Sequence, residues 1–142
     1  MDVASRIGIG AVFVWLGMVL AISFLEAPLK FRAPGITPQL GLGIGRLVFR
    51  ALNVCELLLA VVAAVTLFAH ETSTAATVAL TAAGGALVVQ TAILRPLLSR
   101  RTALVLAGEH DRGRSIAHYL YVGLEVVKVV ALIAAGVLLL GG

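Results

Sequence analysis

Long runs of apolar residues alternate with short basic segments along this chain. Four stretches reach the length of about 20 mostly apolar residues that a helix needs to cross a bilayer. They cover residues 4–27, 47–69, 74–94 and 115–140. The pattern predicts an all-α integral membrane protein in which residues 1–142 form a single transmembrane domain, a four-transmembrane-helix bundle.

Prolines and polar residues set the expected helix ends. The first helix is expected to end at Pro28, because proline lacks a backbone donor and restricts the residue before it. The third helix is expected to end in the same way at Arg95 and Pro96. Between the second and third helices only a short polar turn, residues 70–72, is available to cap the next helix. Such a turn allows only an antiparallel hairpin.

The basic residues predict the orientation. The loops after the first and third helices, with the helix starts that follow them, hold Lys30, Arg32, Arg46, Arg50, Arg95, Arg100, Arg101, Arg112 and Arg114, whereas the opposite side holds only Arg6. Because cytoplasmic loops are enriched in Lys and Arg, both basic loops are expected in the cytoplasm and both termini outside. The expected location is the cell inner (plasma) membrane, with the lipid bilayer as the surrounding partner.

Composition narrows the class further. Hydrophobic residues make up 61% of the chain and charged residues 13%, too few polar side chains to cover a soluble domain of this length. The formal charge of +4 would suit nucleic acid, but the arginines gather in loops rather than along a helix face, so nucleic acid is not an expected partner. Cys55 is the only cysteine, which excludes an intramolecular disulfide.

Small residues mark two further segments. The third helix is rich in Ala and Gly over residues 75–86, which favours close packing within the chain or across a homo-oligomer. Gly41, Gly43 and Gly45 precede the second helix and are expected to form a flexible loop. The alternative is an anion site, with Arg46 and Arg50 at the positive end of the helix dipole.

A weak internal repeat relates the second and fourth helices, which both open with basic, polar and acidic residues at similar offsets. The two sets are Arg46, Arg50, Asn53 and Glu56, and Arg114, His118, Tyr121 and Glu125. Two helical hairpins related by an axis along the membrane normal, a pattern known among transporters, would explain the match. Coincidence is the alternative.

Ionisable residues inside the predicted helices are the main clue to function. Glu56, Glu125 and Lys128 would each be costly in the bilayer unless paired or hydrated. On the fourth helix, His118, Tyr121, Glu125 and Lys128 follow one another at helical spacing and form one stripe. The other helices add Glu26, Arg50, Asn53 and Gln90. These residues predict one polar pocket that opens towards the cytoplasm.

Two interpretations of this pocket stay open. In the structural one, Lys128 pairs with Glu56 or Glu125 and only fixes how the helices pack. In the functional one, carboxylates in excess of one lysine hold a proton, a cation or a polar group of a small molecule. A di-iron site is not expected, since His118 and Glu125 are seven residues apart rather than three. No metal or other cofactor is predicted.

Two families resemble parts of this sequence. The first resemblance rests on Leu94, Arg95, Pro96 and Leu97, then Arg100, Arg101 and Thr102, and finally His118. These residues resemble the small transmembrane 205-like proteins, a resemblance that supports the four-helix topology. Arg46, Asn53 and Glu56 also follow the order found in the membrane-associated glutathione and eicosanoid enzymes, the MAPEG family. That resemblance implies a trimer in which these three residues bind glutathione.

The function expected from these features is a small proton- or cation-linked transporter or channel that acts as an oligomer. Glu56 and Glu125 would bind the ion, Lys128 would tune them, and His118 with Arg50 would line the cytoplasmic mouth. One alternative is a MAPEG-like enzyme that uses glutathione on a lipophilic substrate, and the other is a structural or assembly subunit. No catalytic residue is assigned.

Overall fold

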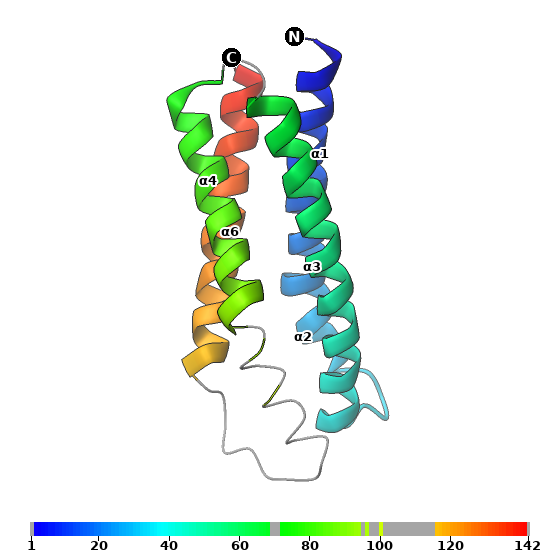
Figure 1. Cartoon of the computed structure of the whole chain (residues 1–142). Coiled ribbons are helices and arrows are strands. Elements are labelled where there is room, and N and C mark those ends of the chain that lie inside the picture. Colours follow the sequence, from blue (N-terminus) through cyan, green and yellow to red (C-terminus); the bar gives the residue numbers. More distant parts are fainter. Residues whose placement is uncertain (1, 69–71, 95, 97–99, 101–115, 142) are drawn as a thin grey trace.

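The computed structural model of the chain is a bundle of long helices (Figure 1). It describes residues 2–68, 72–94, 96, 100 and 116–141. The elements in chain order are α1 (Val3–Val19), η1 (Leu20–Glu26), α2 (Ala27–Lys30), α3 (Pro38–Phe68), α4 (Thr74–Val89), η2 (Gln90–Leu94) and α6 (Ile116–Gly141), where η1 and η2 are π-helical segments.

Among the described residues, four helices are long and apolar enough to cross a membrane. They run over Val3–Lys30, Pro38–Phe68, Thr74–Ile93 and Tyr119–Gly141. The first is one continuous helix made of α1, η1 and α2. The predictions of an all-α multi-pass protein and of four helices of spanning length are therefore confirmed.

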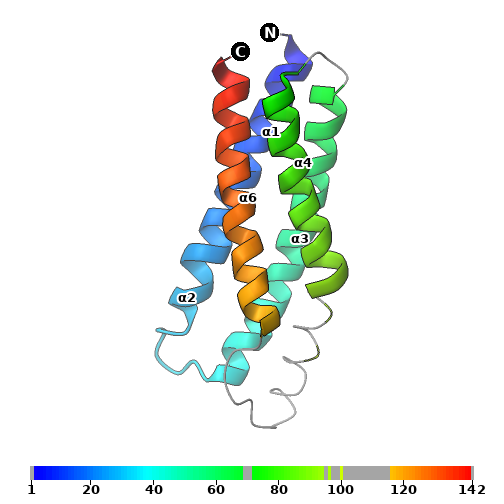
Figure 2. The same cartoon turned by 90° about the vertical axis from the view of Figure 1, so that its left-hand side faces the viewer.

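The helices form two hairpins that meet along one seam. α1 packs along α3, α4 packs along α6, and the two pairs join where α1 contacts α6 (Figures 1 and 2). α3 and α4 contact each other far less closely. The N- and C-termini lie at one end of the bundle, and the connection between α2 and α3 lies at the other (Figure 1). We call these the terminal end and the loop end.

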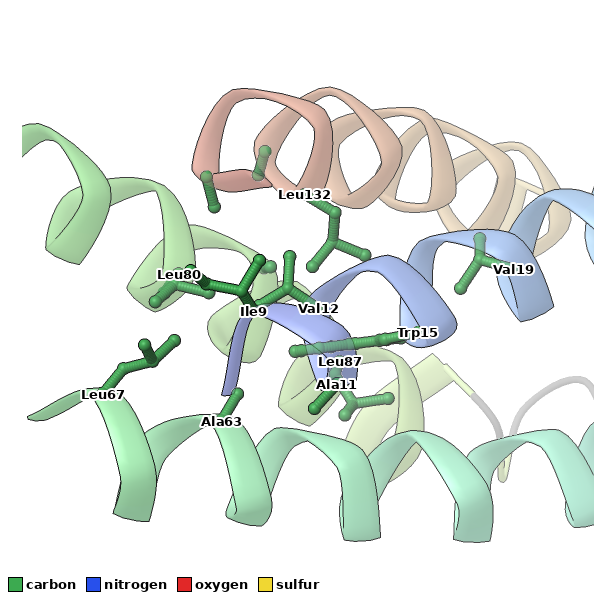
Figure 3. Close-up of a cluster of buried hydrophobic side chains, with 13 residues drawn as sticks. Ile9, Ala11, Val12, Trp15, Val19, Ala63, Leu67, Leu80, Leu87 and Leu132 are labelled. Atoms are coloured by element: carbon green, nitrogen blue, oxygen red, sulfur yellow. The ribbon is translucent and has the colours of Figure 1, made fainter. Parts of the chain in front are cut away.

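The apolar core fills the half of the bundle nearer the terminal end. Val12, Trp15 and Val19 follow one another at offsets of three and four on α1 and face Leu87 of α4 and Leu132 of α6 (Figure 3). This spacing places the side chains on one face of the helix. The core separates the centre of the bundle from the terminal end.

The first helix does not end at Pro28, and that prediction is wrong. Pro28 lies inside α2, directly after the π-helical segment η1. Pro28 is the second residue of α2, and its ring nitrogen offers no N–H to the ladder of the preceding π-helical segment. The helix continues to Lys30.

The glycine-rich segment is helical rather than a loop, which corrects a second prediction. α3 begins at Pro38, and the backbone N–H of Leu40 donates to Thr37 Oγ1 at 3.1 Å as a cap. Gly41 and Gly45 lie one turn apart on the face that meets the end of the first helix: a Cβ added at Gly45 would lie 2.7 Å from Lys30 Nζ. Tertiary contact thus favours helix here despite the low propensity of glycine.

The extension of α3 also corrects the alternative prediction of an anion site at the start of the second helix. Arg46 and Arg50 lie well inside α3, away from the unpaired N–H groups of its first turn.

The third helix begins at the expected residue, Thr74. Ser73 caps α4 by accepting a hydrogen bond from the N–H of Ala76 at 3.2 Å. η2 ends at Leu94 and α6 begins at Ile116. The residues His70, Glu71 and Arg95, on which the expected turn and helix end partly rest, lie outside the described residues.

Candidate functional site

Three charged side chains meet in the centre of the bundle. Lys128 Nζ lies 2.6 Å from Glu56 Oε1 and 2.6 Å from Glu125 Oε1. Lys128 and Glu56 are 0% exposed and Glu125 is 2% exposed, so all three are removed from the surface of the chain. Glu125 and Lys128 share one face of α6, whereas Glu56 comes from α3 in the other hairpin. The three charges therefore connect the two hairpins.

Gln90 completes the contacts of the lysine. Its Oε1 accepts a hydrogen bond from Lys128 Nζ at 2.8 Å, and its Nε2 donates to Glu125 Oε1 at 2.7 Å and to the carbonyl of Tyr121 at 3.2 Å. Both ends of the fully buried amide are used, which fixes its orientation. Gln90 therefore orients the two charged groups of α6 rather than contributing charge.

Two members of the cluster were not predicted. Trp15 Nε1 donates to Glu56 Oε1 at 2.8 Å, and Ser23 Oγ donates to Glu125 Oε2. A weak signal for both exists in the sequence. Trp15 is the only tryptophan, and a buried indole N–H needs an acceptor. Ser23 lies two turns further along the same helix within an apolar run, but only the fold brings it to Glu125.

Both π-helical segments lie against Glu125. Ser23 belongs to η1 and bonds Oε2, while Gln90 opens η2 and bonds Oε1. A π-helical turn inserts an extra residue and changes which side chains face inward, and such turns are frequent at functional sites. One carboxylate is thus held between π-helical segments of both hairpins.

Among the described residues, one ammonium contacts two carboxylates in this cluster. Trp15, Ser23 and Gln90 donate hydrogen bonds to the carboxylates, and none of these three donors carries a charge. Buried charged groups are costly unless they are paired and hydrogen-bonded, and these three groups are stabilised in both ways.

Glu26 lies in a separate polar group nearer the loop end. Its Oε2 is 3.9 Å from Lys30 Nζ, and the side chain is about one-third exposed. Lys30 Nζ in turn lies over the Phe49 ring, 5.8 Å from its centroid, and Phe49 meets Tyr121 edge to face. Glu26 and Tyr121 therefore lie between the central cluster and the loop end.

The other predicted site residues are distributed along the helices. Asn53 is buried on α3, one turn before Glu56, and Arg46 is half-buried. Arg50 is exposed and does not join the cluster. His118 belongs to α6, but its side chain lies outside the described part of the structure, as does Arg114 of the proposed repeat. The structure thus brings together Glu56, Gln90, Glu125 and Lys128 of the predicted set.

Within the described ranges, no group of three or more His, Cys, Asp or Glu side chains could hold a metal ion.

Comparison with protein-family models, with curated proteins and with solved structures gave no match. The resemblances to the transmembrane 205-like and MAPEG families stay predictions. The functional argument therefore rests on the geometry of the buried cluster.

Proposed function

We propose that this protein is a proton-linked carrier of a small solute, with the buried cluster of Glu56, Glu125, Lys128 and Gln90 as its proton-binding site. The observation that carries the proposal is the single lysine shared by two buried glutamates at 2.6 Å each. One added proton makes the cluster neutral.

The hydrogen bonds of Glu125 suit both charge states. As a carboxylate it accepts, at Oε2, a hydrogen bond from the hydroxyl group of Ser23. When protonated at Oε2, it can donate to the same hydroxyl oxygen, since a serine oxygen both donates and accepts. Gln90 and Lys128 keep their contacts with Oε1 in either state. Proton uptake therefore leaves no buried polar atom of this carboxyl unsatisfied.

A purely structural ion pair would need only one of the two glutamates. The second glutamate brings a further carboxylate to the same lysine. Ionisable residues inside a membrane that face the bundle interior commonly mark ion pathways. The adjoining π-helical segments η1 and η2 supply backbone in which a small change of register would move Ser23 and Gln90.

The path for the proton would lead to the loop end. Ser23 bonds the cluster, Glu26 follows one turn later, and Lys30 follows Glu26 by another turn. Towards the terminal end, the buried core with Val12, Leu87 and Leu132 blocks the way. In the resting conformation the site would thus be reached from one side only, as alternating access requires.

Orientation, membrane and oligomeric state belong to the same proposal. The excess of Lys and Arg at the loop end would place that end in the cytoplasm and both termini outside, in the cell inner membrane. A homo-oligomer would supply the translocation path that one short chain has little room to enclose. The small residues on the exposed side of α4, among them Ala82 and Gly85, would allow close contact between copies.

The glutathione enzyme is the less favoured function. A cosubstrate held by Arg46, Asn53 and Glu56 would have to reach a glutamate that is fully buried and already bound by Lys128 and Trp15. The assembly-subunit alternative predicts that substitutions in the cluster change stability and nothing else.

The test combines proton binding with solute-driven proton movement. Infrared titration of the purified protein should show one carboxyl group that becomes protonated, with a band that is lost in Glu125→Gln. In proteoliposomes with an internal pH dye, a panel of small cations, anions and neutral solutes should include one that drives proton movement. Glu125→Gln should abolish the response to that solute.

Asp2→Asn is the control, because it also replaces a carboxylate by an amide, at the N-cap of α1, outside the cluster and the proposed proton path. It should retain both signals. A wild-type protein that shows no carboxyl band assignable to Glu56 or Glu125, or whose Glu125→Gln variant still couples solute to protons, would overturn the proposal.

A further inference from the structure

Arg50 of α3 is a charged side chain that the proposed proton site does not use. It is exposed, and among the described residues it makes no ion pair, hydrogen bond or ring contact. Lys30, by contrast, lies 3.9 Å from Glu26 and above the ring of Phe49. Arg50 therefore directs its charge away from the described bundle.

The face of α3 that continues from Arg50 towards the terminal end is apolar and exposed. Large side chains recur on this face at helical spacing from Arg50, and each of them is more than half exposed: Leu47, Val54, Leu58, Val61 and Val65. An exposed apolar stripe on a helix of spanning length faces the lipid. Arg50 thus lies on the lipid-facing side of α3.

The depth of Arg50 matches the boundary of a bilayer. α3 ends at Phe68, and the polar residues Thr72 and Ser73 follow it at the terminal end. Arg50 lies about 27 Å from Phe68 along the helix axis, close to the thickness of the hydrocarbon layer, about 30 Å. When Phe68 lies at one surface of that layer, Arg50 lies at the other, at the level of the lipid headgroups.

Arg46 adds a second positive charge at the same boundary. It lies one helical turn nearer the loop end, about 6 Å from Arg50 along the axis, and its side chain is half-buried. Guanidinium groups bind phosphate through paired, charge-assisted hydrogen bonds. Arg46 also interacts with other groups of the chain, so the binding of an outside phosphate depends chiefly on Arg50.

We propose that the loop end of α3 binds an anionic phospholipid, with the headgroup phosphate on Arg50 and Arg46 and an acyl chain along Val54 and Leu58. The site uses the guanidinium groups and not the N–H groups at the start of α3. The inference goes beyond the proposed function and holds whether or not Glu125 takes up a proton.

Charge and position together distinguish this occupant from others. A soluble anion would bind the guanidinium groups but would leave the apolar stripe beside them unused. A helix of a second copy would cover the stripe but would have to bring a carboxylate to Arg50. In the described ranges, Glu26 is the carboxylate nearest the loop end, and it already pairs with Lys30. A phospholipid supplies the phosphate and the acyl chain in one molecule, and basic residues at an anionic membrane surface strengthen its attraction.

The test measures lipid binding to the purified full chain in dodecyl maltoside by native mass spectrometry. Dioleoylphosphatidylglycerol has a net negative charge, whereas dioleoylphosphatidylcholine has the same acyl chains and a phosphate but no net charge. We expect the first phosphatidylglycerol to bind at least about fivefold more tightly than the first phosphatidylcholine, the effect of about one basic residue at a membrane surface.

Variants of Arg50 locate the site. Arg50→Gln should weaken phosphatidylglycerol binding about fivefold and change phosphatidylcholine binding far less, whereas Arg50→Lys, which keeps the charge, should retain most of the affinity. Arg6→Gln is the matched control, because Arg6 is an exposed arginine of α1 at the terminal end, and it should bind both lipids as the wild type does. Equal thermal unfolding of these proteins without added lipid separates loss of the site from loss of the fold.

Four results would overturn the inference. The first is equal affinity of the wild type for the two lipids, which means that charge is not recognised. The second is an equal effect of Arg50→Gln and Arg6→Gln, which assigns the binding to any exposed arginine. The third is displacement of the lipid by an equal concentration of glycerophosphoglycerol, the headgroup without acyl chains, which assigns the arginines to a soluble anion. The fourth is a dimer that Arg50→Gln dissociates, which assigns this face to a second copy.

Discussion

Lys128 is the side chain on which the other charges of the cluster depend. It contacts Glu56, Glu125 and Gln90 within 2.8 Å and is fully buried. Removing a single partner from a buried ion pair is far more costly than removing the whole group, because the remaining charge stays uncompensated. Substitution of Lys128 therefore tests directly how the cluster is stabilised.

Lys128→Met should lower the free energy of unfolding by about 3–5 kcal/mol, since two carboxylates would then remain without their ammonium group. The triple variant Lys128→Met, Glu56→Gln, Glu125→Gln should recover most of that loss. Thermal unfolding in detergent measures both. If the triple variant is no more stable than Lys128→Met, charge imbalance is not the cause of the loss.

Trp15→Phe should lower the free energy of unfolding by about 1–3 kcal/mol, because Glu56 loses a buried hydrogen-bond donor and the smaller ring leaves a space in the core. Phe13→Leu, a change of an exposed aromatic residue on the same helix, is the control and should change stability far less. Denaturation followed by circular dichroism compares them. Equal losses of stability in the two variants would mean that the hydrogen bond from the indole N–H does not stabilise the fold.

At the scale of the elements, close contact between helices depends on single glycines. A Cβ added at Gly8 would lie 2.6 Å from Leu67 Cγ on α3, whereas a Cβ added at Gly10 would meet no atom within 4 Å. Helix α1 therefore packs closely against α3 on the face that holds Gly8, whereas the face that holds Gly10 has room for a side chain.

Gly8→Ala should destabilise the bundle by about 1–3 kcal/mol through this overlap. Gly10→Ala, made two residues away on the same helix, should be neutral or slightly stabilising, because alanine has the higher helix propensity. Thermal unfolding of the two variants side by side decides the matter. A Gly8→Ala protein as stable as Gly10→Ala would show that α1 and α3 separate easily.

Across the whole molecule, both termini lie at one end and the α2–α3 connection at the other (Figure 1). The bundle therefore has two possible orientations in a membrane, with the loop end either in the cytoplasm or outside. The distribution of Lys and Arg favours the loop end in the cytoplasm.

Cysteine labelling of intact cells tests that orientation. In a Cys55→Ala background, Asp2→Cys should react with a membrane-impermeant maleimide, and Ala33→Cys, in the exposed connection between α2 and α3, should react only after permeabilisation. The opposite pattern would reverse the assigned topology and, with it, the side from which the proton site is reached.

The sequence by itself determined the all-helical class, the four helices of spanning length found among the described residues and the central charges. Runs of about 20 apolar residues can satisfy their backbone groups in lipid only as helices, so length and composition suffice. The same reasoning selected Glu56, Glu125 and Lys128, because buried charges need partners whatever the fold. Helical spacing then placed Glu125 and Lys128 on one face.

Only the tertiary structure decided the rest. It extended α3 back to Pro38 through Gly41, which faces Phe31, and Gly45, which faces Lys30, and it kept Pro28 within a helix directly after a π-helical segment. It also brought Trp15 and Ser23 to the glutamates and left Arg50 outside the cluster. These features depend on contacts between residues up to 102 positions apart, which local propensity and periodicity do not encode.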